Sequence, residues 1–460
     1  MSLLAIAFVL VSSLLALRLP WVGVLAYYLF SIMQMQYLWP REFGQARVQL
    51  ILFGATLLGL AVATAMKSVD WRRLLTPFSL LMVLLVIMVN LSMHFSGFTY
   101  YVDPIQDLNA PSLLTNIDRL EIFNKTLAFY FIASLLIDTR KKLEWSIYTF
   151  AGILLYYTWW ANKIYLTGEY WRFGHNGRLS GPLMSNYYDE NTLAMLFVMA
   201  TPVLYYLGIA RKTVFFRYGI WFFIPLTWHA LFLTSSRGGL LSLGVVCIYV
   251  LFRSFDRKAS IGLAVGLVLA VAYQSGQLLT RVDDTIDASK QVEQSSEIRL
   301  DPRLISWGVA TEIMRDYPLL GVGVGNFEKA FPNYSETAVH VAHNTFFQFA
   351  ANCGIVAGLI YLWQFARRLP TLKRSADIKG TRNFPRGFDR DYLDDLLNSL
   401  LLAMFMVAIF LDLMIYEIVY FVFLLSFAKY NLDRENPPEK HRLIDSIYRE
   451  REKEQRKSTN

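Results

Sequence analysis

Long apolar runs alternate along the chain with short polar and basic segments. In the run Ile261–Tyr273 nearly every position is apolar, so polar and apolar residues do not alternate. A helix needs about 20 mostly apolar residues to cross a bilayer, whereas a β-barrel strand would alternate. The pattern predicts an all-α polytopic membrane protein of about 12–13 transmembrane helices. The predicted spans are 2–17, 20–38, 47–66, 76–94, 118–137, 145–161, 191–210, 218–235, 238–252, 259–276, 344–366, 395–413 and 416–429.

Basic residues gather in some of the loops between these spans. The clusters are Arg140–Lys142, Arg211–Arg217, Arg253–Lys258 and the segment 367–390. Cytoplasmic loops of membrane proteins are enriched in Lys and Arg, so we expect these loops inside the cell. The chain then divides into a transmembrane domain over 1–430 and a polar cytoplasmic tail over 431–460. The segments expected outside are 94–117, 162–190 and the large segment 277–342.

The composition argues against some classes of function. Hydrophobic residues make up 55% of the chain and charged residues 17%, and the formal net charge is +8. The excess of basic residues lies in loops and in the tail, with no basic patch interleaved with stacking aromatics, so we expect no nucleic-acid partner. Cys247 and Cys353 both lie in apolar runs, and no Cys or His residues have zinc spacing. The sequence therefore predicts neither a metal site nor a cofactor.

The sequence Ser235-Ser236-Arg237-Gly238-Gly239 separates two predicted spans on the outer side. An arginine at the edge of the membrane interior is costly and is often functional. The glycines that follow it allow close backbone packing. The alternative is an arginine whose side chain extends to the outer headgroups. We favour a functional role for Arg237.

The outer loop 168–190 combines basic, aromatic and turn residues. Arg172 and Arg178, together with the neighbouring aromatic side chains, could hold an anionic ligand that carries sugars. The alternative interpretation is an interfacial aromatic belt with turn residues. Glu190 lies where the next span begins.

The large outer segment ends with Val339-His340-Val341-Ala342-His343-Asn344 and then enters a span. A histidine at this position can accept a proton near neutral pH. Alternatively His343 contacts the start of the helix, with Asn344 as its cap. His340 is the competing candidate for a base.

An amphipathic stretch begins at Arg303 and runs to Met314. The glycine-rich sequence over 318–325 follows it and has the glycine content of a phosphate loop. No strand–loop–helix unit surrounds this sequence, and it is predicted to lie outside the cell, so we reject a nucleotide site.

Taken in order, these motifs resemble the O-antigen ligase / Wzy-type polymerase superfamily over about residues 160–365. The residues that carry the resemblance are Arg178, Gly181, Asn186 and Asn191, Ser236-Arg237-Gly238-Gly239, Arg303 and Trp307, Pro318–Gly323, Ala342-His343-Asn344 and Gly354-Ile355-Val356. Near the amino terminus, Arg18-Leu19-Pro20 and Val22–Leu25 are similar to the putative O-glycosylation ligases of exosortase-associated systems.

The resemblance implies a fold similar to the GT-C glycosyltransferases in a bacterial inner membrane, with the active face in the periplasm. Members transfer a glycan from undecaprenyl pyrophosphate to a hydroxyl of a glycan, lipid or protein acceptor, inverting the anomeric centre without a metal. It implies His343 as the base, and Arg178 and Arg237 as pyrophosphate ligands with Arg303 in support. Supporting roles are open for Asn344, Glu190, Arg172 and His340. The chain departs from the family pattern at Asp189-Glu190 and at Ala351-Asn352-Cys353.

Two other functions fit parts of the pattern. A Wzy-type polysaccharide polymerase shares these motifs with the ligases, and we favour the ligase on the similarity of the amino-terminal motifs. A transporter or flippase of lipid-linked glycans would also use basic residues. Transporters often show two related halves with broken spans, and we find no such repeat in the sequence.

Overall fold

The computed structural model describes residues 3–44, 47–99, 114–174, 177–253, 257–273, 302–366 and 392–435. Within these ranges the chain is helical, and the one β-bridge pairs Phe173 with Leu179. The longer helices are α1 (Leu3–Arg18), α2 (Pro20–Met33), α5 (Val48–Ala65), α6 (Pro77–Phe95), α8 (Asn116–Leu136), α9 (Arg140–Thr167), α10 (Glu190–Ile209), α12 (Phe223–Thr234), α13 (Arg237–Arg253), α14 (Arg257–Tyr273), α16 (Pro302–Asp316), α18 (Thr345–Cys353), α19 (Ile355–Ala366), α21 (Tyr392–Ala408) and α22 (Glu417–Glu435).

Shorter helical segments connect or cap these helices. They are α3 (Met35–Leu38), α4 (Pro40–Phe43), η1 (Trp71–Leu74), η2 (Tyr170–Arg172), α11 (Val214–Trp221), α17 (Phe327–Ala330) and η3 (Phe331–Asn333). The helical structure of the described residues confirms the all-α prediction and is consistent with a polytopic membrane protein. Among the described residues, α5, α6 and α10 are long and apolar enough to cross a membrane. The total number of spans stays a prediction.

Helix α10 lies at the centre of one half of the bundle. It packs against α9, α12, α13 and α21, and 94% of its most apolar window is buried inside the protein. In α5 and α6 the buried share is only 28% and 33%, and apolar side chains such as Leu58 and Leu80 are exposed. A helix that exposes apolar side chains over most of its surface is suited to contact with lipid tails.

Several predicted boundaries were wrong. The span predicted over 344–366 is two helices, α18 and α19, because the chain breaks at Gly354. This glycine has φ +92°, and a Cβ there would lie 2.0 Å from the carbonyl oxygen of Leu319. Apolar residues continue through the break, so hydropathy gave no sign of it. Likewise, 20–38 divides at Gln34 (φ 53°), and 218–235 comprises α11 and α12.

The two carboxyl-terminal spans also differ from their predicted limits. The predicted span 395–413 ends early, because α21 stops at Ala408 and residues 409–416 form a loop. Helix α22 continues to Glu435, beyond the predicted start of the tail at 431. Its last turns are stabilised by Lys429, which pairs with Asp394 at 3.3 Å and Asp433 at 2.6 Å. The rest of the predicted tail, and residues 277–301 of the outer segment, lie outside the described residues.

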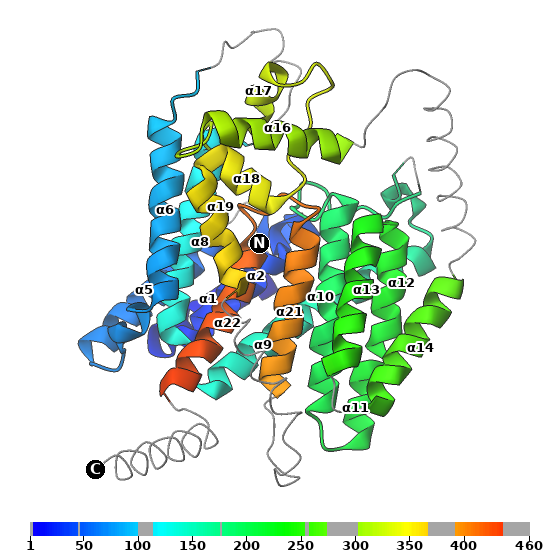
Figure 1. The fold of residues 1–460 in the computed structure, drawn as a ribbon. Helices are drawn as coiled ribbons and strands as arrows, with labels where there is room; N and C mark the ends of the chain where they lie inside the picture. The colour runs from blue at the N-terminus through cyan, green and yellow to red at the C-terminus, as the bar shows by residue number, and fades with distance from the viewer. Residues whose placement is uncertain are drawn as a thin grey trace, which may run out of the picture.

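The segment from 302 onward, which is predicted to lie outside the cell, forms a layer (the outer layer) across one end of the bundle, called here the α16 end (Figure 1). Val309, Ile313, Val322 and Phe331 belong to a small apolar core in this layer. Hydrogen bonds from the amides of Val322 and Gly323 to the carbonyls of Ala351 and Asn352 join it to α18. Helix α11, which follows the basic residue Arg211, lies at the opposite end of the bundle (Figure 1).

Candidate functional site

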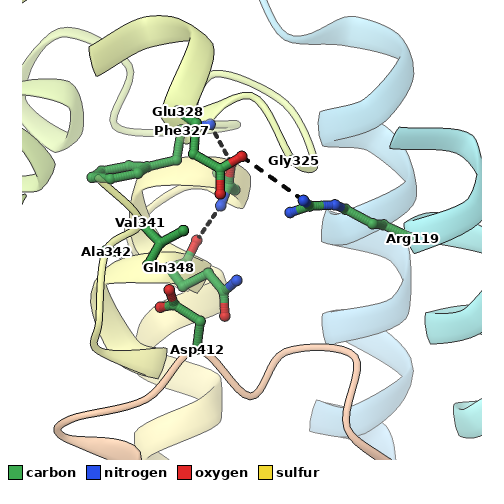
Figure 2. Close-up of a pocket in the computed structure, with 9 residues that line it drawn as sticks. Arg119, Gly325, Phe327, Glu328, Val341, Ala342, Gln348 and Asp412 are labelled. Atoms are coloured by element: carbon green, nitrogen blue, oxygen red, sulfur yellow. Dashed lines mark hydrogen bonds and ion pairs between the residues drawn. The ribbon is translucent and has the colours of Figure 1, made fainter. Parts of the chain in front are cut away.

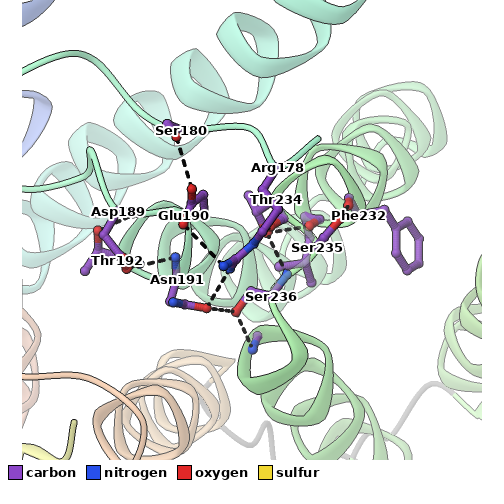
Figure 3. Close-up of polar contacts among 12 residues, drawn as sticks. Arg178, Ser180, Asp189, Glu190, Asn191, Thr192, Phe232, Thr234, Ser235 and Ser236 are labelled. Atoms are coloured by element: carbon purple, nitrogen blue, oxygen red, sulfur yellow. Dashed lines mark hydrogen bonds and ion pairs between the residues drawn. The ribbon is translucent and has the colours of Figure 1, made fainter. Parts of the chain in front are cut away.

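Arg178 lies between the start of α10 and the end of α12 (Figure 3), and these helix ends lie at the α16 end of the bundle (Figure 1). Its Nε donates a hydrogen bond to the carbonyl of Thr234 (3.1 Å), and its Nη2 donates to Oδ1 of Asn191 (3.1 Å). Nη1 lies 3.4 Å from Oε2 of Glu190. About a quarter of the Arg178 side chain is exposed (24%), so the guanidinium is held in place and still reaches the surface.

The turn that carries Arg237 is attached to the same residues. Ser235 ends α12 in a left-handed conformation (φ 51°), and α13 begins at Arg237. Ser236 Oγ donates to Oδ1 of Asn191 (2.8 Å) and accepts from the amide of Gly239 (3.1 Å). Asn191 Oδ1 therefore accepts hydrogen bonds from both Arg178 and Ser236, which places the start of α13 beside Arg178 (Figure 3).

The loop 409–416 connects this region to α16. A Cβ added to Gly238 would lie 3.1 Å from the ring of Phe410, so α13 packs closely on this loop. The guanidinium of Arg303, in the first turn of α16, lies over the same ring at 5.6 Å from its centroid. Phe410 thus lies between Arg303 and the residue that follows Arg237.

The same loop also holds His343 and the start of α18. The carboxylate of Asp412 accepts hydrogen bonds from the amides of His343 (3.1 Å) and Asn344 (3.2 Å). Thr345 Oγ1 donates to the carbonyl of Leu411 (2.6 Å). His343 has a left-handed backbone (φ 49°), which is unfavourable for a residue with a side chain. Strained backbone of this kind is often found at functional sites, and here Asp412 helps to maintain it.

Asn344 caps α18, as one of the two interpretations of this motif expected. Its Oδ1 accepts hydrogen bonds from the amides of Phe346 (3.0 Å) and Phe347 (3.2 Å). The cap orients the amino end of α18 toward the 409–416 loop. The helix amino termini of α10, α13 and α18 therefore all lie at the α16 end, where their dipoles favour an anion (Figure 1).

Arg172 and His340, which have predicted supporting roles, lie against aromatic side chains. Arg172 pairs with Glu169 and lies over the rings of Trp171 (4.2 Å) and Trp160 (5.5 Å), in the aromatic surroundings expected of an interfacial belt. His340 packs its ring edge-to-face on Phe331 of the outer layer, with centroids 6.2 Å apart. Glu190, by contrast, lies beside Arg178 and also accepts from Ser180 Oγ (3.2 Å).

A polar pocket adjoins Asp412 on the side of α8 (Figure 2). It is small: the space that the centre of a water-sized molecule can occupy is about 10 Å³. Its charged lining residues are Arg119, Glu328 and Asp412. Sequence reasoning missed all three. Asp412 was placed inside a predicted span, where an acidic residue would itself have suggested function.

Residues 221–362 match a family model described as O-antigen ligase. This stretch includes Arg237, Arg303 and His343, whereas Arg178 and Asp412 lie outside it. A search of curated proteins found no match to the chain.

Proposed function

The match over residues 221–362 supports membership of the O-antigen ligase / Wzy-type superfamily, and on that basis we propose that the protein transfers a glycan from undecaprenyl pyrophosphate to an acceptor hydroxyl. The family supports a glycan-transferring membrane protein of the ligase or polymerase type. The proposal adds the donor, the acceptor group, the residues and a location on the periplasmic face of a bacterial inner membrane.

One observation carries the proposal. The 409–416 loop contacts the elements that carry Arg237, Arg303 and His343: Phe410 meets Gly238 and Arg303, and Asp412 binds the amide of His343. Asn191 then joins Arg178 to the turn before Arg237. Residues more than 160 positions apart in sequence therefore gather at one end of the bundle, where a lipid-linked substrate could reach them from the membrane.

The arginines suit the leaving group. As the sugar departs, charge develops on the pyrophosphate oxygens, and guanidinium groups bind phosphate with two parallel hydrogen bonds while remaining ionised. Cations already positioned at developing charge are commonly the largest catalytic contribution. The positive ends of α10, α13 and α18 add to this field. In the proposed reaction no metal is needed to bind the diphosphate.

His343 is the proposed base. The acceptor oxygen bonds to the anomeric carbon, and the bond from this carbon to the pyrophosphate oxygen breaks with both electrons on the leaving group. The hydroxyl proton passes to the imidazole of His343, and general-base assistance of this kind is worth about 10²–10⁴-fold in rate. Attack from the face opposite the leaving group inverts the anomeric centre.

The test is reconstitution of the purified full-length protein in lipid nanodiscs with an undecaprenyl-pyrophosphate glycan and a glycan acceptor, without ATP. Formation of the joined product supports the transferase. Movement of donor across a liposome membrane without bond transfer would instead support a carrier and overturn the proposal.

A genetic measurement separates the two transferase types. If the gene is deleted in its host, loss of glycan attachment with long chains retained indicates a ligase, which we propose. Loss of the long chains themselves would identify a polymerase.

A further inference from the structure

The main-chain groups of Asn186, in the loop between Arg178 and α10, are held from three sides. The amide of Asn186 donates a hydrogen bond to Oε1 of Gln34 (2.8 Å). Its carbonyl accepts from Tyr416 Oη (3.3 Å) and from Thr192 Oγ1 (2.9 Å). Gln34 ends α2, Tyr416 precedes α22 and Thr192 lies in the first turn of α10. Three elements that are far apart in sequence therefore meet at one residue of this loop.

Gln34 makes its contact from a strained turn. It is buried (7% exposed) and has a left-handed backbone (φ 53°, ψ 50°), which is uncommon for a residue with a long side chain. Its amide donates to the carbonyl of Phe30, and its carbonyl accepts from the amide of Tyr37 in α3 (2.9 Å). Glycine would end α2 with less strain, but it has no side chain to bind the loop. The cost of a glutamine here is explained by its bond to Asn186.

Helix α2 also holds the start of α22, directly after Tyr416. Tyr27 Oη donates to Oε1 of Glu417 (2.9 Å), and Gln49 Nε2 on α5 donates to the same oxygen. The amino-terminal helices thus contact both the loop before α10 and the beginning of α22. These contacts fix the two segments relative to each other.

The held loop leads directly into the diphosphate site. Thr192 Oγ1 joins the carbonyl of Asn186 to the first turn of α10. In the same turn, Asn191 Oδ1 accepts from Arg178 Nη2 (3.1 Å) and from Ser236 Oγ (2.8 Å) (Figure 3). A shift of the loop would therefore change the distance between Arg178 and the start of α13, where the second proposed diphosphate ligand lies.

We propose that Gln34 and Tyr416 are positioning residues for the diphosphate site: by holding Asn186 they set the distance between Arg178 and Arg237. The two hydrogen bonds are called here the Asn186 clamp. The assignment rests on the proposed function, because it takes the two arginines as ligands of one diphosphate. Misplacement of a binding group by about 1 Å can cost about 10²-fold in rate, so a bond that does not touch the substrate affects transfer. Both positioning residues lie outside the stretch that matches the family model.

Hydrogen exchange tests the clamp without any need for catalysis. Gln34→Met keeps the length of the side chain and removes the acceptor, whereas Tyr416→Phe removes only a hydroxyl. The full-length variants are placed in nanodiscs, and exchange of the amides over 178–192 is followed by mass spectrometry. We expect exchange in this segment to be about threefold faster or more in each variant, since a neutral hydrogen bond contributes that much to local stability.

Two matched variants serve as controls. Gln36→Met makes the same change two residues away, where Oε1 has no hydrogen-bond partner in the part of the chain that the structure describes. Tyr334→Phe removes a hydroxyl that donates to Asp316 in the outer layer (2.9 Å). Exchange over 178–192 should match the wild type in both controls. Wild-type exchange in Gln34→Met and Tyr416→Phe as well would overturn the clamp.

Donor affinity then tests the positioning role. Binding of undecaprenyl pyrophosphate to the same nanodiscs is measured by isothermal titration. We expect the Kd to rise about fivefold in Gln34→Met and in Tyr416→Phe, with the double variant below the product of the two changes because both act through Asn186. In transfer assays the KM for donor should rise and the KM for acceptor should not.

The possible failures are distinguishable. Faster exchange with an unchanged Kd would show that the clamp holds the loop but does not position the arginines. A wild-type protein that does not bind undecaprenyl pyrophosphate would refute the proposed function, and the positioning role with it. The exchange experiment would still decide whether the clamp exists.

Discussion

Asp412 holds His343 by its backbone: Oδ2 of the carboxylate accepts the hydrogen bond of the His343 amide at 3.1 Å, while Oδ1 accepts that of Asn344 at 3.2 Å. The left-handed conformation of His343 is thereby stabilised at the mouth of the bundle, and the imidazole is positioned where α18 begins. Asp412 acts through His343 in this account and is a positioning residue.

Burial should make stability depend on pH through Asp412. Desolvation raises the pKa of its carboxyl to about 7, outweighing the two amide hydrogen bonds that favour the charged form. The folded protein then binds this proton more tightly than the unfolded chain. The stability that Asp412 contributes is greatest at low pH and is lost as the pH rises through the folded pKa.

We therefore expect the unfolding midpoint of the wild type, relative to Asp412→Asn, to be lower at about pH 8 than at about pH 5. Thermal unfolding of both proteins in the same detergent provides the measurement. A difference between the two proteins that is equal at both pH values would show that Asp412 does not titrate in this range.

Arg178→Lys should weaken donor binding. Lysine carries the charge but cannot reproduce the two-pronged contact with phosphate or the simultaneous bonds to Thr234 and Asn191. We expect the Kd for an undecaprenyl-pyrophosphate glycan to rise about tenfold or more. Arg315→Lys, at an exposed position on α16, is the control. Unchanged affinity for the donor in Arg178→Lys would show that Arg178 does not bind the diphosphate.

Glu190→Gln should have the opposite effect. Glu190 lies 3.4 Å from Arg178, so its carboxylate would compete with a phosphate for the guanidinium. Because both side chains are partly exposed, the ion pair is weak, and its removal should tighten donor binding by about two- to fivefold. Isothermal titration in nanodiscs measures the change. Weaker binding in this variant would mean that Glu190 contacts the donor directly.

Gly238→Ala tests the contact between α13 and the 409–416 loop. The added methyl group would lie 3.1–3.3 Å from three atoms of Phe410, so this ring and the neighbouring Arg303 must shift. Displacements of this kind lower transfer strongly, and we expect a loss of about an order of magnitude in kcat/KM. Gly244→Ala on the same helix has no atom within 4 Å of the added Cβ and should retain full activity. Similar activity in both variants would show that the position of Phe410 does not affect catalysis.

The sequence predicted part of this site for clear physical reasons. Arg178, Arg237 and His343 stand beside the ends of apolar runs on one predicted side, so their common location at the α16 end followed from topology. The break at Gly354 could not be predicted, because apolar residues resume directly after it and the glycine is required by its φ of +92° and by the close approach of Leu319. Asp412 was hidden for a similar reason, since the apolar run continues past the end of α21 at Ala408.

Arg119 was missed because a basic residue at the start of a span usually just marks its boundary with water. Its place in the pocket beside Asp412 depends on Gly325 and Glu328, which are more than 200 positions away and reach it only through the folding of the outer layer. The same holds for Phe410, whose contacts with Gly238 and Arg303 no local pattern encodes. Contacts made by loops that join distant elements cannot be predicted from local sequence patterns.

In the proposed reaction His343 removes the proton of the acceptor while the arginines hold the diphosphate. This division of roles is tested most directly by measuring donor binding and glycan transfer with the same preparation of His343→Ala, with His340→Ala as the control. We expect His343→Ala to insert in the membrane and to bind donor as the wild type does, yet to form no product, whereas His340→Ala remains active. Product formation by His343→Ala at the wild-type rate would contradict this expectation.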